Sequence, residues 1–308
     1  MINQNSLSTE QGKQAFVSII MNCYNGERYL KEAIDSVLAQ THKNWEIIFW
    51  DNQSTDQSAE IFKSYDDPRL KYSYAPAHTL LYEARNYAIE KASGEFLAFL
   101  DVDDWWHPEK LEKQIPLFDD PEVGFVCCNY WVVQEKQKSR KLFSKKTLPD
   151  GWVLNDLLID YPVGLLTLVI RRTAFDALRI GCDPRFHIIG DIDLVVRLAM
   201  KWKMACCQEP MACYRLHGEN ESRKQKTRQV AEYQIWVEEL GKNPDILGLS
   251  GYKKVIDEFT YMQGRLCIDQ NKKAEAKRHL RDLPWGKYKI KLWINVTIPR
   301  CFRPLITI

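Results

Sequence analysis

Three aspartates follow directly after a short apolar segment in the stretch FLAFLDVDDWW, residues 96–106. Asp101 and Asp103 stand two residues apart, and Asp104 comes next. Carboxylates in this spacing at the end of a strand can bind a hard divalent cation, Mg²⁺ or Mn²⁺, which takes its remaining ligands from water and phosphate oxygens. The same spacing is common in solvated turns, so the metal hypothesis depends on where the strand ends.

A second pair of carboxylates, Asp191 and Asp193, lies in GDIDL at the start of a helix predicted over residues 190–202. A carboxylate in a first helical turn can take the proton of an attacking hydroxyl. The helix dipole lowers the pKa of such a group and burial raises it. Residues two apart do not share a helix face, so only one of the two is expected to act. The alternative is that both are merely favourable charges at a helix N-terminus.

Apolar strand patterns and amphipathic helix patterns alternate through the first half of the chain, which predicts a parallel α/β sheet. Ligands bind such sheets beyond the carboxyl ends of the strands. Three predicted strands end there in polar clusters, at residues 22–25, 51–52 and 101–104. The predicted strands cover residues 16–24, 45–51, 70–75, 95–101, 123–133 and 164–172. The aspartates therefore lie where such a sheet keeps its ligand.

The composition is that of a globular protein, with 308 residues, 45% of them hydrophobic, and a formal charge of +2. The charge is uneven, because residues 221–308 carry 18 Lys and Arg against 10 Asp and Glu, a net +8, which leaves −6 for the rest. Nine cysteines without a Cys-x-x-Cys spacing favour neither a zinc site nor a disulfide framework. The sequence has neither a signal-peptide pattern nor a transmembrane stretch, so we expect a cytoplasmic protein. We also expect no nucleic-acid partner.

Three segments in order resemble the family 2 glycosyltransferases of the GT-A fold: VSIIMNCYNGERYLKEAIDSVLAQTHKNWEIIFWDNQSTD, ARNYAIEKASGEFLAFLDVDD and GDIDLVVRLA. The resemblance covers roughly residues 15–222. It implies a Rossmann-like α/β fold, a mostly parallel sheet flanked by helices, here with a C-terminal helical extension. The expected organisation is a flexible N-terminus (1–14), a GT-A domain (15–222), a helical region (223–284) and a basic, aromatic tail (285–308).

In the first matching segment, the resemblance implies a pocket for the base of a nucleotide donor. Tyr24 would stack on the base, and Asn22 and Asn25 would line the same pocket. Asp51 would accept a hydrogen bond from the base.

The later segments are implied to hold the diphosphate, the sugar and a divalent cation, Mn²⁺ or Mg²⁺. Arg85 and Asn86 would approach the diphosphate or the sugar. Asp101 would meet the ribose or the metal, Asp103 would ligate the metal, and His217 in YRLHGENES would reach the metal or the diphosphate.

Asp191 stands where this family has its general base, and it is expected to be the catalytic residue. The family has a glutamate before the base, whereas this chain has Gly190. That departure and the nearness of Asp193 leave the register of the base open at this stage.

The function that follows from the resemblance is an inverting, metal-dependent glycosyltransferase. It would move a sugar from a nucleotide-diphosphate donor, a UDP-sugar by expectation, to a hydroxyl of a glycan or lipid-linked glycan in bacterial surface polysaccharide or lipopolysaccharide synthesis. The competing hypotheses are a catalytically degenerate, sugar-nucleotide-binding scaffold and a nucleotidyltransferase. An oxidoreductase is disfavoured because no Gly-x-Gly-x-x-Gly follows the first strand.

Two segments lie outside these motifs. Residues 134–150 are polar and basic and are expected to form a surface loop or flap. In the tail, apolar residues alternate with Lys287, Lys289 and Lys291, which predicts a strand packed on the core. The alternative for the tail, with Trp285, Trp293, Arg300, Phe302 and Arg303, is a peripheral contact with the cytoplasmic face of a membrane.

Overall fold

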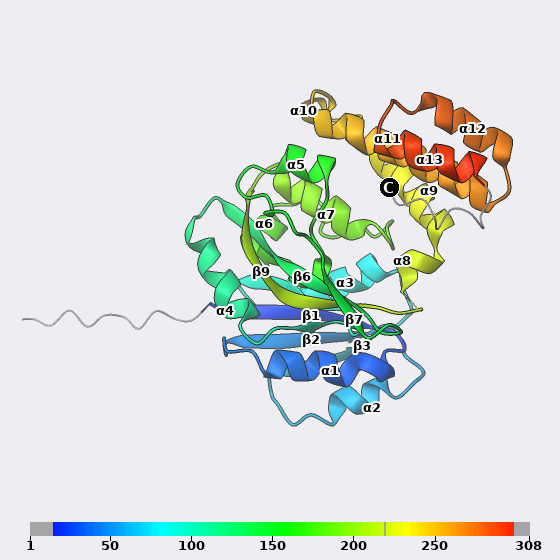
Figure 1. The fold of residues 1–308 in the computed structure, drawn as a ribbon. Coiled ribbons are helices and arrows are strands. Elements are labelled where there is room, and N and C mark those ends of the chain that lie inside the picture. The colour runs from blue at the N-terminus through cyan, green and yellow to red at the C-terminus, as the bar shows by residue number, and fades with distance from the viewer. Residues whose placement is uncertain (1–14, 219, 299–308) are drawn as a thin grey trace, which may run out of the picture.

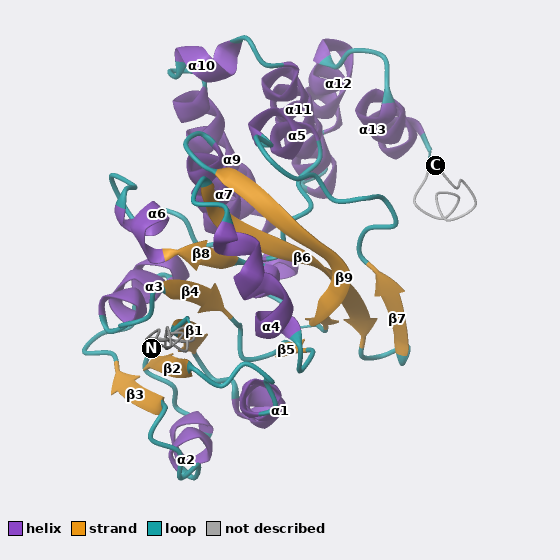
Figure 2. Ribbon diagram, turned by 90° about the vertical axis from the view of Figure 1, so that its left-hand side faces the viewer, coloured by secondary structure: helices purple, strands orange, loops and turns teal. Residues whose placement is uncertain are grey.

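The computed structural model describes residues 15–218 and 220–298, and the expected flexible segment 1–14 lies outside them. Nine strands form one sheet in the order β3-β2-β1-β4-β8-β6-β9-β5, with β7 paired to β6 (Figure 2). The strands are β1 Val17–Cys23, β2 Trp45–Asp51, β3 Leu70–Tyr74, β4 Phe96–Phe99, β5 Trp105–Trp106, β6 Val123–Gln134, β7 Ser139–Leu142, β8 Val169–Arg171 and β9 Lys203–Leu216.

The strands β3, β2, β1 and β4 are parallel to one another and correspond to the predicted strand–helix alternation. Strands β1, β2 and β4 are buried throughout, as continuous apolar runs require when helices cover both faces of a sheet. In the other half β6 and β9 are parallel, and β8 pairs antiparallel with both β4 and β6. The predicted mixed α/β architecture is confirmed.

Helices cover both faces of the sheet, so two large apolar clusters form, one on each side (Figure 1). Leu30, Ile34 and Val37 are fully buried on one face of α1, as their spacing predicts. The helices of the first two thirds of the chain are α1 Glu27–Leu38, α2 Ser58–Lys63, α3 Leu81–Glu90, α4 Lys110–Gln114, α5 Leu154–Ile159, α6 Arg172–Asp176 and α7 Gly190–Ala199, with 3₁₀ turns η1 Ile115–Asp119 and η2 Leu165–Thr167.

The rest of the described chain is helical, and its last three helices pack together beyond the sheet (Figure 1). Its helices are α8 Glu221–Lys224, α9 Lys226–Leu240, α10 Pro244–Leu247, α11 Ser250–Asp269, α12 Lys273–Asp282 and α13 Lys287–Thr297. None of the helices in the described part of the chain is long and apolar enough to cross a membrane.

The strand predicted in the tail is wrong, because residues 287–297 form the helix α13. The alternating apolar residues include Tyr288, Leu292 and Val296, which are four apart and therefore also share a helix face. Leu292 is fully buried, and its side chain lies where a Cβ on Gly264 of α11 would be, so the two helices pack closely. Pro299, Arg300, Phe302, Arg303 and Pro304 lie outside the described residues.

The expected loop at 134–150 is partly a hairpin. Its residues 139–142 form β7, which pairs antiparallel with the end of β6. Lys138, at the turn, has a φ of 47°, in the left-handed region. The basic side chains of this segment that lie on β7, Arg140 and Lys141, are exposed as predicted.

Candidate active site

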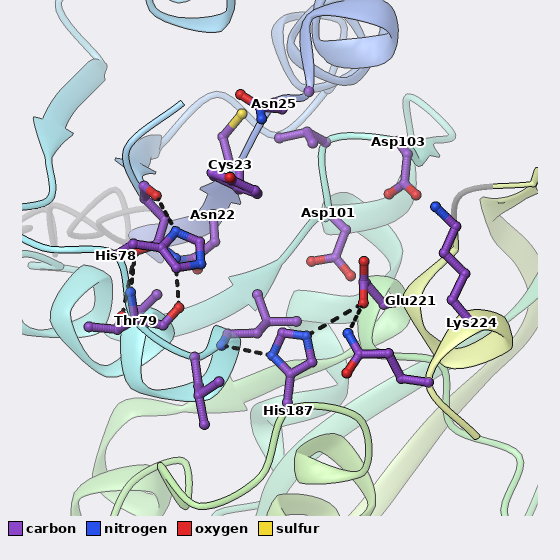
Figure 3. A pocket seen from close by; sticks show the side chains of 18 of the residues that line it. Asn22, Cys23, Asn25, His78, Thr79, Asp101, Asp103, His187, Glu221 and Lys224 are labelled. Carbon is purple, nitrogen blue, oxygen red and sulfur yellow. Dashed lines mark hydrogen bonds and ion pairs between the residues drawn. The ribbon is translucent and has the colours of Figure 1, made fainter. Parts of the chain in front are cut away.

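A cavity of about 690 Å³ opens at the carboxyl ends of the parallel strands (Figure 3). Its wall combines the end of β1, the loops after β2, β3 and β4, the end of β9 and the helices α8 and α9. Of the residues predicted to bind donor or metal, the cavity is lined by Asn22, Tyr24, Asn25, Asp101, Asp103 and His217. Residues far apart in the sequence are thus brought together, as expected for a ligand site at this edge of a sheet.

One end of the cavity presents an aromatic face beside an unpaired amide. Tyr24 is 55% exposed, and its ring centroid lies 4.5 Å from that of His78. Asn22 is only 7% exposed, yet neither its Oδ1 nor its Nδ2 has a hydrogen-bond partner among the described residues. A buried polar group is normally paired, so this donor and acceptor are suited to the edge of a bound base.

Asn25 supports this end of the cavity from the turn after β1. It has a φ of 54°, a conformation that asparagine tolerates better than most residues. Its Oδ1 accepts a hydrogen bond from the backbone N–H of Thr55, at 2.8 Å. Asn25 therefore joins the turns that follow β1 and β2.

Asp51 does not line the cavity, in contrast to the predicted contact with a base. It is completely buried and accepts hydrogen bonds from the Tyr72 hydroxyl, at 2.8 Å, and from the backbone N–H of Ser54, at 2.7 Å. The next residue, Asn52, lines the cavity instead. Successive residues of an extended chain point to opposite sides, so a one-residue difference in register decides which side chain meets the ligand.

Arg85 lies behind Asp101 rather than in the cavity wall. It is 2% exposed, and its Nη2 donates a hydrogen bond to Asp101 Oδ1 at 2.6 Å. Its guanidinium carbon lies 4.5 Å from the centroid of the buried Tyr82 ring. The other terminal nitrogen, Nη1, is buried without a hydrogen-bond partner in the described chain. Arg85 therefore fixes the orientation of Asp101.

Asn86 is held away from the cavity by the backbone of Cys182. Its Nδ2 donates to the Cys182 carbonyl at 2.7 Å, and its Oδ1 accepts from the Cys182 N–H at 2.9 Å. Both ends of the amide are thus committed to the segment before α7.

The other end of the cavity brings Asp103 and His217 together across 114 positions of sequence. His217 Nε2 lies 2.9 Å from Asp103 Oδ2. Arg215, on β9, strengthens this junction because its Nε donates to the Asp103 carbonyl at 2.9 Å. No group of three or more His, Cys, Asp or Glu side chains suited to a metal occurs in residues 15–218 and 220–298. Asp101, paired with Arg85, does not join the other two.

The carboxylate and imidazole of this pair fit a divalent cation whose other ligands are phosphate oxygens of a bound substrate and water. Mg²⁺ and Mn²⁺ sites in phosphate-handling proteins commonly use one or two protein carboxylates, with phosphate oxygens and water completing the shell. Asp103 is 25% exposed and His217 is 9% exposed at the side chain, both toward the cavity. Among the described residues, the carboxylate of Asp103 and the imidazole of His217 therefore fit the predicted divalent cation.

Asp104, the third aspartate of the opening stretch, has a structural position. It is 3% exposed, and its Oδ1 accepts a hydrogen bond from the backbone N–H of Arg215 at 2.8 Å. Burial, together with the neighbouring Asp103 and Asp101, holds the pKa of Asp104 well above its ordinary value. It joins the loop after β4 to the end of β9, and so aligns Asp103 with His217.

The structure separates the two candidate bases on α7. Asp193 is buried, and its Oδ2 lies 2.6 Å from Arg197 Nη2 in a salt bridge one helical turn along. The carboxylate of Asp191 makes no salt bridge to a described residue, and burial raises its pKa to about 6 despite the charge of Arg85. A pKa near neutrality suits a general base, so this difference favours Asp191.

Gly190 is explained by Tyr82. A Cβ at position 190 would lie 2.5 Å from the Tyr82 ring, so the ring occupies the space of any larger side chain. That ring is 3% exposed and stacks against the Arg85 guanidinium. The Tyr82 ring therefore fills the space in which the side chain of a glutamate at position 190 would begin.

We expect Gly190→Ala to destabilise the protein by about 1–3 kcal/mol, because overpacking a rigid contact costs about this much. The ring cannot retreat without breaking its contact with Arg85. The matched control is Gly248→Ala, where a Cβ meets nothing within 4 Å and φ is −78°. Urea denaturation of both variants measures the change in the free energy of unfolding. Equal stability of the two variants would contradict the packing account.

Several cavity residues were not predicted, and most lie in loops or in the helices after His217. Lys224 and Arg228 stand four apart in residues 221–308, which carry a net charge of +8. That charge was the one feature of the sequence that pointed to a role for these two residues. The residues of the wall that the sequence analysis missed include His78, Thr79, His187, Glu221, Lys224, Gln225 and Arg228. Asn52 was expected at this edge of the sheet only as part of the cluster 51–52.

Comparison with known proteins agrees with the fold and the site. Residues 18–173 match the family model "Glycosyl transferase family 2". This match covers half of the chain and includes the ends of β1, β2 and β4. The chain therefore belongs to glycosyltransferase family 2.

The similar curated proteins include two bacterial glycosyltransferases with specific names. Over 160 residues the chain is 37% identical to the Escherichia coli UDP-Glc:alpha-D-GlcNAc-diphosphoundecaprenol beta-1,3-glucosyltransferase WfgD, covering 51% of this chain and 60% of that protein. It is 34% identical over 158 residues to the putative teichuronic acid biosynthesis glycosyltransferase TuaG of Bacillus subtilis (strain 168), covering 51% and 62%. The match thus spans about three fifths of these relatives.

Solved structures confirm the GT-A type of fold. S. aureus TarS 1-349 in complex with UDP-GlcNAc has a TM-score of 0.63 at 19% identity, covering 87% of this chain and 82% of that one. The mannosyltransferase PcManGT from Pyrobaculum calidifontis, in complex with GDP-Man and Mn²⁺, has a TM-score of 0.60 at 15% identity, covering 96% and 84%. At these identities the likeness concerns the fold alone.

Proposed function

We propose that this protein is an inverting, metal-dependent glycosyltransferase that uses a UDP-sugar and extends a bacterial surface glycan. The observation that carries the proposal is the layout of one cavity, with Asn22 and His78 on one side and Asp103 on the other (Figure 3). The ring of Tyr24 lies beside His78, and His217 lies beside Asp103. A nucleoside diphosphate has the same polarity, with a flat base at one end and a charged diphosphate at the other.

The proposed reaction is a single displacement at the anomeric carbon of the donor sugar. An acceptor hydroxyl oxygen forms the new bond to this carbon as the bond to the diphosphate oxygen breaks, which inverts the configuration. Asp191 takes the hydroxyl proton, and the electron pair of the broken bond remains on the diphosphate. When bound to Asp103 and His217, a divalent cation supplies Lewis-acid stabilisation of that charge. Lys224 and Arg228, in the wall of the same cavity, add positive charge to it.

The preference for uridine rests on the relatives. WfgD is named for UDP-Glc, and TarS was solved with UDP-GlcNAc. PcManGT was solved with GDP-Man, which makes a guanosine donor the alternative. Asn22 offers one donor and one acceptor, which complement the N3–H and a carbonyl oxygen of uracil.

The acceptor is proposed to be a glycan on a lipid diphosphate, because the name of WfgD specifies such an acceptor. The division into a GT-A domain at 15–222 and a helical region at 223–284 is proposed with it. In this division Lys224 and Arg228 of the helical region still reach into the donor cavity.

The test is hydrolysis and transfer from a panel of UDP- and GDP-sugars, with Mn²⁺ or Mg²⁺ and a GlcNAc-diphospho-lipid acceptor. We expect turnover with one UDP-sugar and a product of inverted anomeric configuration. Binding of a UDP-sugar without hydrolysis or transfer would favour the degenerate scaffold. Release of pyrophosphate from a nucleoside triphosphate would favour a nucleotidyltransferase.

We also propose that α13 contacts an anionic membrane surface. Trp285 is 86% exposed, and Ile290 and Trp293, three apart on one face of α13, are 37% and 52% exposed. Lysines accompany these apolar side chains at positions 287, 289 and 291. Aromatic and basic residues together suit the interface of a bilayer rich in anionic lipid, where each basic residue near the surface contributes about 1 kcal/mol.

The double variant Trp285→Ala/Trp293→Ala is expected to bind vesicles of phosphatidylglycerol and phosphatidylcholine about a hundredfold or more weakly, because each buried aromatic ring contributes about 1.5–3 kcal/mol. Substitution is preferable to truncation, since Leu292 of the same helix is buried in the core. Cosedimentation is the measurement, and Trp152→Ala, at a tryptophan that is 59% exposed elsewhere, is the control. Equal binding by both variants would exclude this surface.

A further inference from the structure

Glu232 is a buried carboxylate that the proposed chemistry does not use. It lies on α9 and is 4% exposed. An ionised side chain at this depth is costly unless it is paired. Its partners therefore indicate what it does.

Four donors among the described residues form hydrogen bonds with the Glu232 carboxylate. Oε1 accepts from the backbone N–H of His187, at 2.9 Å, and from Arg228 Nε, also at 2.9 Å. Oε2 accepts from the backbone N–H of Ile188, at 2.8 Å, and of Ile189, at 3.3 Å. One carboxylate thus binds three consecutive backbone amides.

These three amides immediately precede α7, the helix that carries Asp191 in its first turn. Ile189 is the N-cap residue of α7, and its own side chain supplies no capping hydrogen bond. A negative charge at this end of a helix is favourable. Glu232 thus supplies the capping charge from another helix, 43 residues further along the chain.

The same segment is also held from the opposite side. His187 Nδ1 accepts a hydrogen bond from the backbone N–H of Leu81, the first residue of α3, at 3.3 Å. Helix α3 carries Tyr82 and Arg85, which lie behind Gly190 and Asp101. The segment 187–189 is therefore clamped between α3 and α9, and Asp191 follows it by two residues.

Arg228 connects this clamp to the cavity. It donates to Glu232 and also forms part of the cavity wall. His187 lines the same cavity (Figure 3). A ligand in the cavity that attracts Arg228 acts on the partner of Glu232. Arg228 and Glu232 therefore connect the cavity wall to the segment before α7.

We propose that Glu232 is a positioning residue that holds Asp191 in place for proton transfer, and that α9 is therefore part of the active site. The proposal rests on the proposed function in one respect only, the role of Asp191 as base. The helical region after residue 222 then holds the general base Asp191 in position and also forms part of the cavity wall.

The first test is Glu232→Gln, which keeps the shape and removes the charge. A glutamine nitrogen at either oxygen position would face two N–H donors, so at least two of the four hydrogen bonds are lost. We expect kcat for transfer to fall by about 10-fold to 100-fold, the cost of a small misplacement of a catalytic group. The KM for the donor should change by a smaller factor than kcat, because only His187 and Arg228 among these partners of Glu232 line the donor cavity. Asn22, Tyr24 and the Asp103–His217 pair are untouched. Glu238→Gln, at an exposed position of the same helix, is the matched control and should behave as wild type.

Glu232→Asp retains the charge with a shorter reach and should recover part of the lost kcat. If Glu232 served folding alone, its variants would be less stable, but kcat would not decrease in the order wild type, Glu232→Asp, Glu232→Gln. Wild-type kcat in a folded Glu232→Gln variant would overturn the proposal, as would equal losses in kcat for the Gln and Asp variants.

Amide hydrogen exchange gives a readout that does not need activity. Residues 187–192 should exchange faster in Glu232→Gln than in wild type, while β1 and β2 remain protected. If wild type has no transferase activity with any donor, the proposed function fails, but this measurement still tests the clamp. Unchanged exchange at 187–192 would overturn the positioning role whatever the activity, and if Glu232→Gln does not fold, Glu232→Asp takes its place in both measurements.

Discussion

Asp191→Asn is expected to lower the rate of glycosyl transfer by about 10²–10⁴, the range found when a general base is removed. The carboxamide keeps the shape of the side chain, but it cannot accept the proton of the acceptor hydroxyl. Donor affinity should be unchanged, because Asp191 does not line the donor cavity. Steady-state kinetics and calorimetry with the donor measure the two quantities separately.

Asp193→Asn is the matched control for this variant. Asp193 is paired with Arg197, whose guanidinium also donates to the carbonyls of Ile180 and Gly181. Its replacement should lower the stability of the protein more than the chemical step. An active Asp191→Asn variant beside a folded but inactive Asp193→Asn variant would show that the base is Asp193.

The dependence of wild-type kcat/KM on pH should reflect the ionisation of Asp191. Burial raises the pKa of Asp191 to about 6, while Arg85 opposes this shift and Asp101 adds to it. A base must be deprotonated, so kcat/KM should fall below pH 6 by roughly tenfold for each pH unit. The acidic limb should be absent from the residual activity of Asp191→Asn. A limb near pH 4, the range of an ordinary exposed carboxyl, would contradict the burial of the base.

Asp103→Ala is expected to abolish measurable turnover and to remove the dependence of donor binding on Mn²⁺ or Mg²⁺. The structure brings the carboxylate of Asp103 and the imidazole of His217 together in the cavity. Loss of the carboxylate leaves the cation to be held more by the diphosphate. Calorimetric titration of UDP, with and without Mn²⁺, is the measurement, and a chelator should have the same effect on wild type.

The control for Asp103→Ala is Asp35→Ala, which removes an exposed aspartate that is paired with Lys31 on the surface of α1. It should leave metal dependence and turnover unchanged. If Asp103→Ala binds Mn²⁺ and UDP as wild type does, the assignment of the metal ligand is wrong, and Asp101 becomes the next candidate.

The sequence by itself determined the architecture of the first half and the edge of the sheet where the site lies. Both depend on local patterns, because burial on two faces requires continuous apolar strands and the polar residues that follow them must stand at the strand ends. Asn22, Tyr24 and Asp103 reach the cavity for this reason. The helical face of α1 was predictable from its spacing on the same grounds.

Only the tertiary structure decided the details that depend on partners distant in the chain. Asp191 differs from Asp193 because Arg197 pairs with the second, and Gly190 is required because Tyr82 fills its space. Asp51 is turned into the sheet by Tyr72, whereas its neighbour reaches the cavity.

The tail shows most clearly that a local pattern does not determine which structure forms. Its alternating residues satisfy a strand and a helix equally well, since every second residue includes every fourth. The helix forms because α11 offers Gly264 as a close surface for Leu292. The periodicity of a segment determines which faces it can bury, but the neighbour that covers a face is fixed only when the whole chain has folded.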